Sequence, residues 1–100
     1  MAHALKVQPI RGENYPVAEH AEEVKRPYRL WDTKEKLQVP YAYFVNLRHC
    51  HMRALCEAAW SRGDSVFEVI DIRNGGLRGQ YRRVGGNIEF WRSHHALEEQ

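Results

Sequence analysis

The sequence predicts an α+β fold in which an antiparallel sheet of four to five strands packs on one main helix. Two groups of short segments with alternating apolar residues lie on either side of a single amphipathic segment. The turn sequences at 74–76 and 85–87 contain paired glycines and asparagine, which favour tight hairpins. Segments 28–34 (YRLWDTK) and 67–73 (FEVIDIR) also share the same order of residue types: an aromatic residue, a charged residue, two apolar residues and an aspartate. Together these observations predict a hairpin–helix–hairpin arrangement.

The first hairpin is predicted between residues 28 and 45. Tyr28, Leu30 and Asp32 alternate with Arg29 and Trp31, which is the period of a strand. A polar loop follows, and residues 37–45 form a second strand rich in residues that favour β-structure. Because Pro40 has no amide hydrogen to donate, this strand is expected to be an edge strand or to carry a bulge there.

The main helix is predicted over residues 47–61. Asn46 is a good N-cap residue, and Gly63 suits a left-handed position after the last turn. The apolar side chains recur at helical spacing and should face the sheet. They are Leu47, Cys50, His51, Ala54, Leu55 and Ala58. Since His51 lies within this stripe, it is expected to be a hydrogen-bonded histidine at the edge of the core.

The second half of the sequence predicts strands over 66–72, 77–84 and 88–91. The first of these is apolar on both sides. Phe67 and Val69 point to one face and should meet the helix, whereas alternate residues between 66 and 72 point to the other face. One helix covers one face only, so the N-terminal arm or a second copy of the protein must cover the other. The sequence leaves both options open, and they are compatible.

At 100 residues the chain is expected to form one domain. It divides into an N-terminal arm over 1–26, a core over 27–92 and a polar tail over 93–100, and the arm allows a short helix within 16–25. No apolar run approaches the ~20 residues that span a bilayer. Because the sequence also shows no signal peptide and only two cysteines, a cytoplasmic location is expected.

The sequence contains no recognisable catalytic, metal-binding or cofactor motif, and we expect a protein that is not an enzyme. His49 and His51 are two residues apart on a helix and diverge, so they do not suit one metal ion. Cys56 shares a face with His49, but ~10 Å of helix rise separates them, which is too far for proton transfer. Asp32 and Asp71 each end a strand and are expected to stabilise turns.

The first functional hypothesis is a non-catalytic protein-interaction or binding module that self-associates, most simply as a dimer. Apolar surface on the uncovered sheet face would form the interface. The predicted interface residues are Trp31, Val66, Ile70, Ile72 and Trp91. The acidic segment 13–23 and the basic hairpin 73–92 carry opposite charges that would orient the two copies.

The alternative is a module that binds single-stranded nucleic acid through the basic hairpin 73–92. Arginines there interleave with aromatic residues, a combination that binds phosphates and stacks on bases. The candidate residues are Arg78, Tyr81, Arg82 and Arg83. The net charge of +2 is small for this class of protein.

The strand pattern YRLWDT…VPYAYF, the helix NLRHCHMRALCEAAW and the hairpin FEVIDIRNGGLRGQYR resemble one group of proteins across residues 27–92. These are the small orphan α+β proteins of bacterial mobile DNA, such as those of integron gene cassettes or phages. The resemblance implies a small bacterial protein that is often oligomeric. The resemblance assigns a functional role to no residue of this chain.

Overall fold

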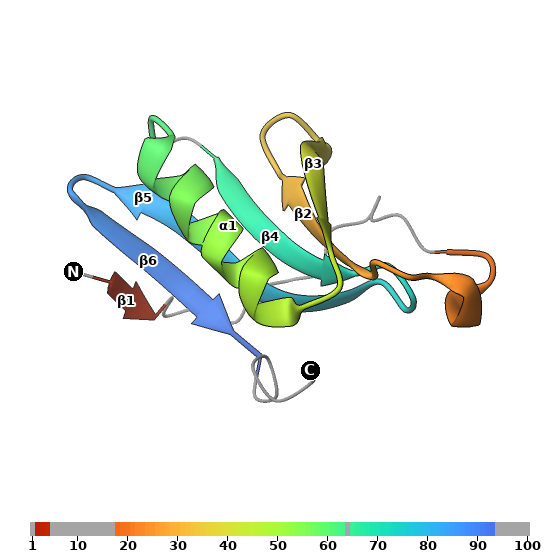
Figure 1. Cartoon of the computed structure of the whole chain (residues 1–100). Helices are drawn as coiled ribbons and strands as arrows, with labels where there is room; N and C mark the ends of the chain where they lie inside the picture. The colour runs from red at the N-terminus through yellow and green to blue at the C-terminus, as the bar shows by residue number, and fades with distance from the viewer. Residues whose placement is uncertain (1, 5–17, 64, 94–100) are drawn as a thin grey trace.

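A computed structural model describes residues 18–63 and 65–93, together with the backbone of residues 2–4. One α-helix lies across one face of a six-stranded sheet (Figure 1). The strand order in the sheet is β1-β6-β5-β4-β2-β3. The elements are β1 (Ala2–Ala4), the short 3-10 helix η1 (Ala21–Glu23), β2 (Tyr28–Asp32), β3 (Leu37–Phe44), α1 (Leu47–Trp60), β4 (Val66–Asp71), β5 (Gly76–Val84) and β6 (Asn87–Arg92).

The five strands from β2 to β6 form the antiparallel sheet that the sequence predicts. β2 pairs with both β3 and β4, and β4, β5 and β6 follow one another as a meander. The two hairpins therefore meet at the β2–β4 pairing. β1 adds a sixth strand that runs parallel to β6 at the edge of the sheet, which the sequence analysis did not predict.

α1 begins at the predicted cap. The Asn46 side chain accepts hydrogen bonds from the backbone N–H groups of Arg48 and His49, at 2.9 and 3.4 Å. These are two of the N–H groups in the first turn, which have no carbonyl partner within the helix. The helix ends at Trp60, one residue before the predicted end, and Gly63 has the expected left-handed backbone with φ of +88°.

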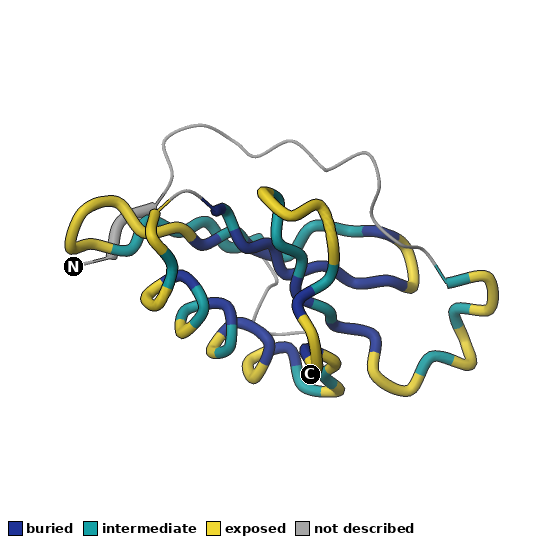
Figure 2. The backbone as a smooth tube through the Cα atoms, turned by 90° about the horizontal axis from the view of Figure 1, so that it is seen from above, coloured by how far each residue is buried: buried dark blue, intermediate teal, exposed yellow. Residues whose placement is uncertain are grey.

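The core lies between α1 and the sheet. The buried side of α1 follows the predicted stripe, and Figure 2 shows this side and the central strands as buried while the outer turns of the helix are exposed. Leu55 differs from the prediction because it is only partly buried, at the rim of the core. Leu30, Val69 and Tyr81 are completely buried in the sheet below the helix.

β3 is both an edge strand and a bulged one, so both options predicted for Pro40 are present. Positions 29 and 31 of β2 pair with positions 43 and 38 of β3, so four residues of β3, 39–42, stand opposite one residue of β2. Tyr41 lies in this bulge with a left-handed backbone, φ +61°. Bulges and proline interrupt the pairing of an edge strand.

Part of the N-terminal arm covers one end of the sheet face opposite α1, called here the back face. The backbone N–H of Ala18 donates to the carbonyl oxygen of Ile72 at 2.7 Å. Ala18 and Val24 pack on Ile70 and Ile72. Of the helix allowed by the sequence over 16–25, residues 16 and 17 lie outside the described residues, and the remainder contains only the single turn η1. The tail 94–100 also lies outside them.

Candidate functional site

The predicted interface residues do lie on one face, the back face. The strand register places Trp31, Glu68, Gln80 and Trp91 in one row across four strands. Gln80 donates a hydrogen bond from its amide to the Glu68 carboxylate, which is buried. This pair was not predicted, although the alternation that places Val66 on the back face also places Glu68 there.

The five predicted interface residues differ in exposure. Ile70 and Ile72 are 0% and 7% exposed, with neighbours within the chain. Trp31, Val66 and Trp91 are partly buried. An interface centred on the two isoleucines would therefore require the segment around Ala18 to move, and their role at an interface stays a prediction.

The four residues predicted to bind nucleic acid do not form one surface. Tyr81 is completely buried beneath α1, so it has no free ring face for a base. Arg82 lies on the opposite face and pairs with Glu89 at 2.7 Å. The physical reason is strand alternation, which sends neighbouring side chains to opposite faces. Arg83 donates to the carbonyl oxygen of Ser61 at the end of α1.

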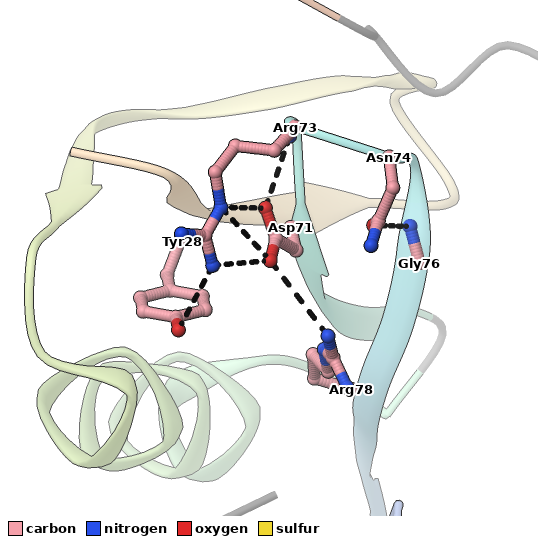
Figure 3. A network of polar contacts seen from close by, with 6 residues as sticks. All are labelled: Tyr28, Asp71, Arg73, Asn74, Gly76 and Arg78. Atoms are coloured by element: carbon pink, nitrogen blue, oxygen red, sulfur yellow. Dashed lines mark hydrogen bonds and ion pairs between the residues drawn. The ribbon is translucent and has the colours of Figure 1, made fainter. Parts of the chain in front are cut away.

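A polar network ties the end of β4 to the turn that follows it (Figure 3). The Arg73 side chain donates to both carboxylate oxygens of Asp71, at 3.0 and 2.7 Å, and also to the Tyr28 hydroxyl. The Arg78 guanidinium lies 3.8 Å from the same carboxylate. Burial alone would raise the pKa of Asp71, but the hydrogen bonds from Arg73 hold it below its usual value.

Asp71 and Asp32 both accept backbone hydrogen bonds in the turns that follow their strands, as expected. Asp71 accepts from the N–H of Arg73, two residues on, at 2.9 Å. Asp32 accepts from the N–H groups of Lys34 and Glu35. These are the contacts that make aspartate favourable at turns. The geometry gives both residues a structural role.

A second network links β6, β5 and α1 inside the core. Arg92 donates from Nε to the Tyr81 hydroxyl at 2.8 Å, and this hydroxyl lies 2.6 Å from Nδ1 of His51. His51 is 2% exposed, which confirms the prediction of a hydrogen-bonded core histidine. Burial, and then the positive charge of Arg92, lower the pKa of His51 to about 4.

We expect this network to make the fold sensitive to acid. The pKa of His51 is about 4 in the fold against 6.5 for a free histidine, so between these values the unfolded chain binds more protons. The free energy of unfolding should therefore rise by up to ~3 kcal/mol from pH 4 to pH 7. The lowered pKa of Asp71 adds a further loss of stability as the pH falls toward and below its ordinary value of 3.8. Urea unfolding across this pH range measures the effect.

Two histidine variants isolate the contribution of His51. His51→Gln should flatten the pH dependence between pH 4 and 6.5. His49→Gln changes an exposed histidine of the same helix and should leave it unchanged. Equal pH profiles for the parent protein and His51→Gln would contradict the assignment.

The two cysteines lie in different environments. Cys50 is completely buried, and burial raises the pKa of its thiol to about 12. Cys56 is exposed on the outer side of α1. Within residues 18–63 and 65–93, no group of three or more histidine, cysteine or acidic side chains is arranged to hold a metal ion.

The most exposed apolar side chains belong to two consecutive elements and the loop between them. Six of the seven large apolar residues that are exposed in the described chain lie between residues 37 and 60. Five of them form what we call the β3–α1 surface: Leu37, Tyr41, Val45, Met52 and Trp60. Tyr43 lies instead on the back face, where the Arg29 guanidinium covers its ring. Trp60 and Tyr41 are 88% and 86% exposed. Arg53 connects the two elements by donating to the carbonyl oxygen of Pro40.

Comparisons with known proteins identify no relative. No family model matches the chain, and no curated protein and no solved structure is similar to it. The resemblance to proteins of integron cassettes and phages therefore rests on the hairpin–helix–hairpin pattern alone. In the part of the chain that the structure describes, no helix has the length and hydropathy needed to cross a membrane.

Proposed function

We propose that this protein is a non-catalytic binding module that self-associates as a symmetric dimer through the β3–α1 surface. The observation that carries the proposal is the almost complete exposure of Tyr41 and Trp60 on neighbouring elements. Tryptophan and tyrosine are enriched among the residues that supply most of the binding energy in protein interfaces. The two elements that carry them are joined by the hydrogen bond from Arg53 to the carbonyl oxygen of Pro40, and contiguous exposed apolar surface often marks an interaction site.

The backbone at Tyr41 supports this proposal. A left-handed conformation costs ~1–2 kcal/mol for a residue other than glycine. Here it holds an aromatic ring in solvent, where the ring adds little to the core of the monomer. Strained backbone is found preferentially at functional sites. Contact of the Tyr41 ring with a partner would offset the free-energy cost of this conformation, which packing within the monomer does not.

A second copy is the partner that fits this surface best. Two-fold pairing is the commonest form of association, and it needs a surface that is complementary to itself. The surface carries both signs of charge, because Arg53 and Glu57 form an ion pair at 2.8 Å beside the bulge of β3. In a two-fold arrangement such pairs can exchange partners between the copies, which would orient them.

The back face and the basic hairpin supply weaker support for function. The isoleucines of the back face already contact Ala18 and Val24. In the hairpin 73–92, Tyr81 is buried, which removes one of the three aromatic residues from contact with bases, whereas Phe90 and Trp91 are only partly buried. Binding to single-stranded nucleic acid therefore stays a prediction without a contact that favours it.

Two substitutions test the β3–α1 surface. We expect Trp60→Ser and Tyr41→Gly each to raise the dimer dissociation constant by ~30-fold, as loss of a hot-spot residue does. Because glycine adopts the left-handed conformation without strain, Tyr41→Gly should also leave the free energy of unfolding unchanged or raise it by ~1 kcal/mol. Sedimentation equilibrium and urea unfolding measure the two effects.

Val84→Ser is the matched control, because Val84 is exposed but lies outside the β3–α1 surface. It should leave the dissociation constant within about twofold of the parent value, since ordinary surface changes have small effects. A dimer that Trp60→Ser and Tyr41→Gly leave intact, and that Trp91→Ser weakens, would place the interface on the back face instead.

A further inference from the structure

We propose that α1 packs antiparallel on α1 of a second copy, through a row of four side chains on its outer side. This row, called here the outer seam, consists of His49, Met52, Cys56 and Ala59. The arrangement rests on the proposed dimer, and it specifies how the two chains meet. Three features carry it: the composition of the exposed side of α1, the spacing of the outer seam and the charges beside it.

The exposed side of α1 is poor in charge. A surface helix normally places charged and polar residues on the side away from the core. Among the residues of α1, six are exposed, and only Arg48 of these six carries a formal charge at neutral pH (Figure 2). The other five are the outer seam and Trp60. Because α1 already packs on the sheet with its other side, an apolar outer side indicates that a second element covers it.

The outer seam has the spacing of helix–helix packing. Its members lie three, four and three residues apart along the chain. This is the alternating spacing of the two apolar positions in a coiled coil, and it keeps one edge of a helix facing a partner helix. The occupant that this spacing fits is therefore another helix, packed nearly parallel or antiparallel to α1.

The outer seam is complementary to itself. A two-fold axis at position 54, midway between Met52 and Cys56, places Met52 of each copy opposite Cys56 of the other. Position 54 is also midway between His49 and Ala59, so the same axis places these two side chains opposite each other. A large side chain then meets a small one at every step along the interface. A second copy of α1 therefore fits the seam without any change of register.

A cavity lies at the end of the outer seam where this pairing places the His49 ring. It has a volume of about 250 Å³ and is lined by Ala59, Arg83, Gly86 and Ile88. Because the cavity adjoins Ala59, the His49 ring of the second copy has a space to enter. This is how a side chain of one helix packs between those of its neighbour in a coiled coil.

The charges beside the outer seam favour the antiparallel direction. Arg53 and Glu57 form an ion pair at 2.8 Å. The axis brings Glu57 of one copy level with position 51 of the other, ~3 Å along the helix from Arg53, so the pairs can also bond across the interface. Parallel packing would bring both Arg48 side chains together at the positive ends of two helix dipoles, where the first turn has no acidic residue. Antiparallel packing places them ~18 Å apart along the helix.

The same arrangement includes the aromatic residues of the β3–α1 surface. Trp60 lies seven residues after Arg53, which is almost two full turns, so both are on one flank of α1. Arg53 donates to the carbonyl oxygen of Pro40, so this flank faces the bulge of β3 that carries Tyr41. A two-fold axis perpendicular to the helix keeps the corresponding flanks of both copies on one side. Trp60 and Tyr41 of the two copies then lie along the same side of the interface.

Cysteine cross-linking tests the direction and the register. His49→Cys, Ala59→Cys and Val84→Cys are each made together with Cys56→Ser, and the remaining Cys50 is completely buried. With oxidised glutathione, the mixture of His49→Cys and Ala59→Cys should form a disulfide-linked dimer at least ~tenfold faster than either variant alone, because only the mixture places two thiols opposite each other. In either variant alone the two thiols are ~15 Å apart along the helix, too far for a disulfide. Val84→Cys lies outside the interface and should cross-link with neither.

A second measurement needs no substitution. The outer seam becomes covered in the dimer, so labelling of Cys56 by iodoacetamide in the parent protein should slow as light scattering shows the dimer forming. An unchanged rate would overturn the proposal.

The outcomes separate this arrangement from self-association as such. Rapid cross-linking of either variant with itself would indicate parallel packing, and dimers that cross-link in no combination would place the interface away from the outer seam. Either result would overturn the antiparallel pairing and leave the dimer intact. A parent protein that stays at the mass of one chain, 11.8 kDa, would instead contradict the proposed function, and the pairing with it.

Discussion

Replacing Leu30 by alanine should lower the free energy of unfolding by ~2–5 kcal/mol, because the substitution opens a cavity in the core. Leu30 is completely buried in β2, between β3 and β4 and below α1. The two hairpins meet at this strand, so its packing joins both halves of the chain. Urea unfolding monitored by tryptophan fluorescence measures the loss.

Val84→Ala and Leu55→Ala provide graded controls for this prediction. Val84 is 43% exposed on β5 and lies outside the β3–α1 surface, so its replacement should change the free energy of unfolding by less than ~0.5 kcal/mol. Leu55 is partly buried at the rim, so its replacement should have an intermediate effect. If Leu30→Ala cost less than Leu55→Ala, the face of the sheet that α1 covers would be wrongly assigned.

Replacing Asp71 by alanine should cost ~3 kcal/mol of unfolding free energy, at the lower end of the range for breaking a buried ion pair. The carboxylate of Asp71 is 1% exposed and faces Arg73 and Arg78. Its removal leaves the more buried of these arginines, Arg78 at 19% exposure, without this counter-charge. The turn after β4 also loses the hydrogen bond from the backbone of Arg73.

Glu89→Gln is the matched control for a surface ion pair. Glu89 pairs with Arg82 at the same distance of 2.7 Å, but both side chains are substantially exposed. Its replacement should cost less than ~1 kcal/mol. Equal losses for Asp71→Ala and Glu89→Gln in urea unfolding would show that burial does not strengthen the Asp71 pair.

Local signals in the sequence were sufficient to predict most of the fold. Alternation of apolar residues, glycine–asparagine turns and the Asn46 cap each act over a few residues, and the structure confirms the strands and α1 to within two residues at each end. Pro40 predicted the irregular edge strand for the same reason, since a missing amide hydrogen is a property of one residue. β1 could not be predicted, because a three-residue strand is formed by pairing with β6 and carries no pattern of its own.

The exposure of aromatic residues could not be predicted, because it depends on where each strand lies in the sheet. Tyr81 and Tyr41 both belong to strands, yet Tyr81 lies in β5 below α1 and Tyr41 lies in the bulge of the edge strand. The nucleic-acid hypothesis therefore assigned a base contact to Tyr81, which is buried. The exposed Tyr41 was not predicted as a contact residue. The pair of Glu68 and Gln80 was missed because their contact depends on the register between β4 and β5.

The most direct test of the proposed function is the mass of the intact protein in solution. One chain has a mass of 11.8 kDa. Light scattering over a concentration series from low micromolar upward should give a mass that rises to twice this value. Trp60→Ser should shift that rise to higher concentration, whereas Val84→Ser should not. A mass that stays at 11.8 kDa at every concentration would contradict self-association.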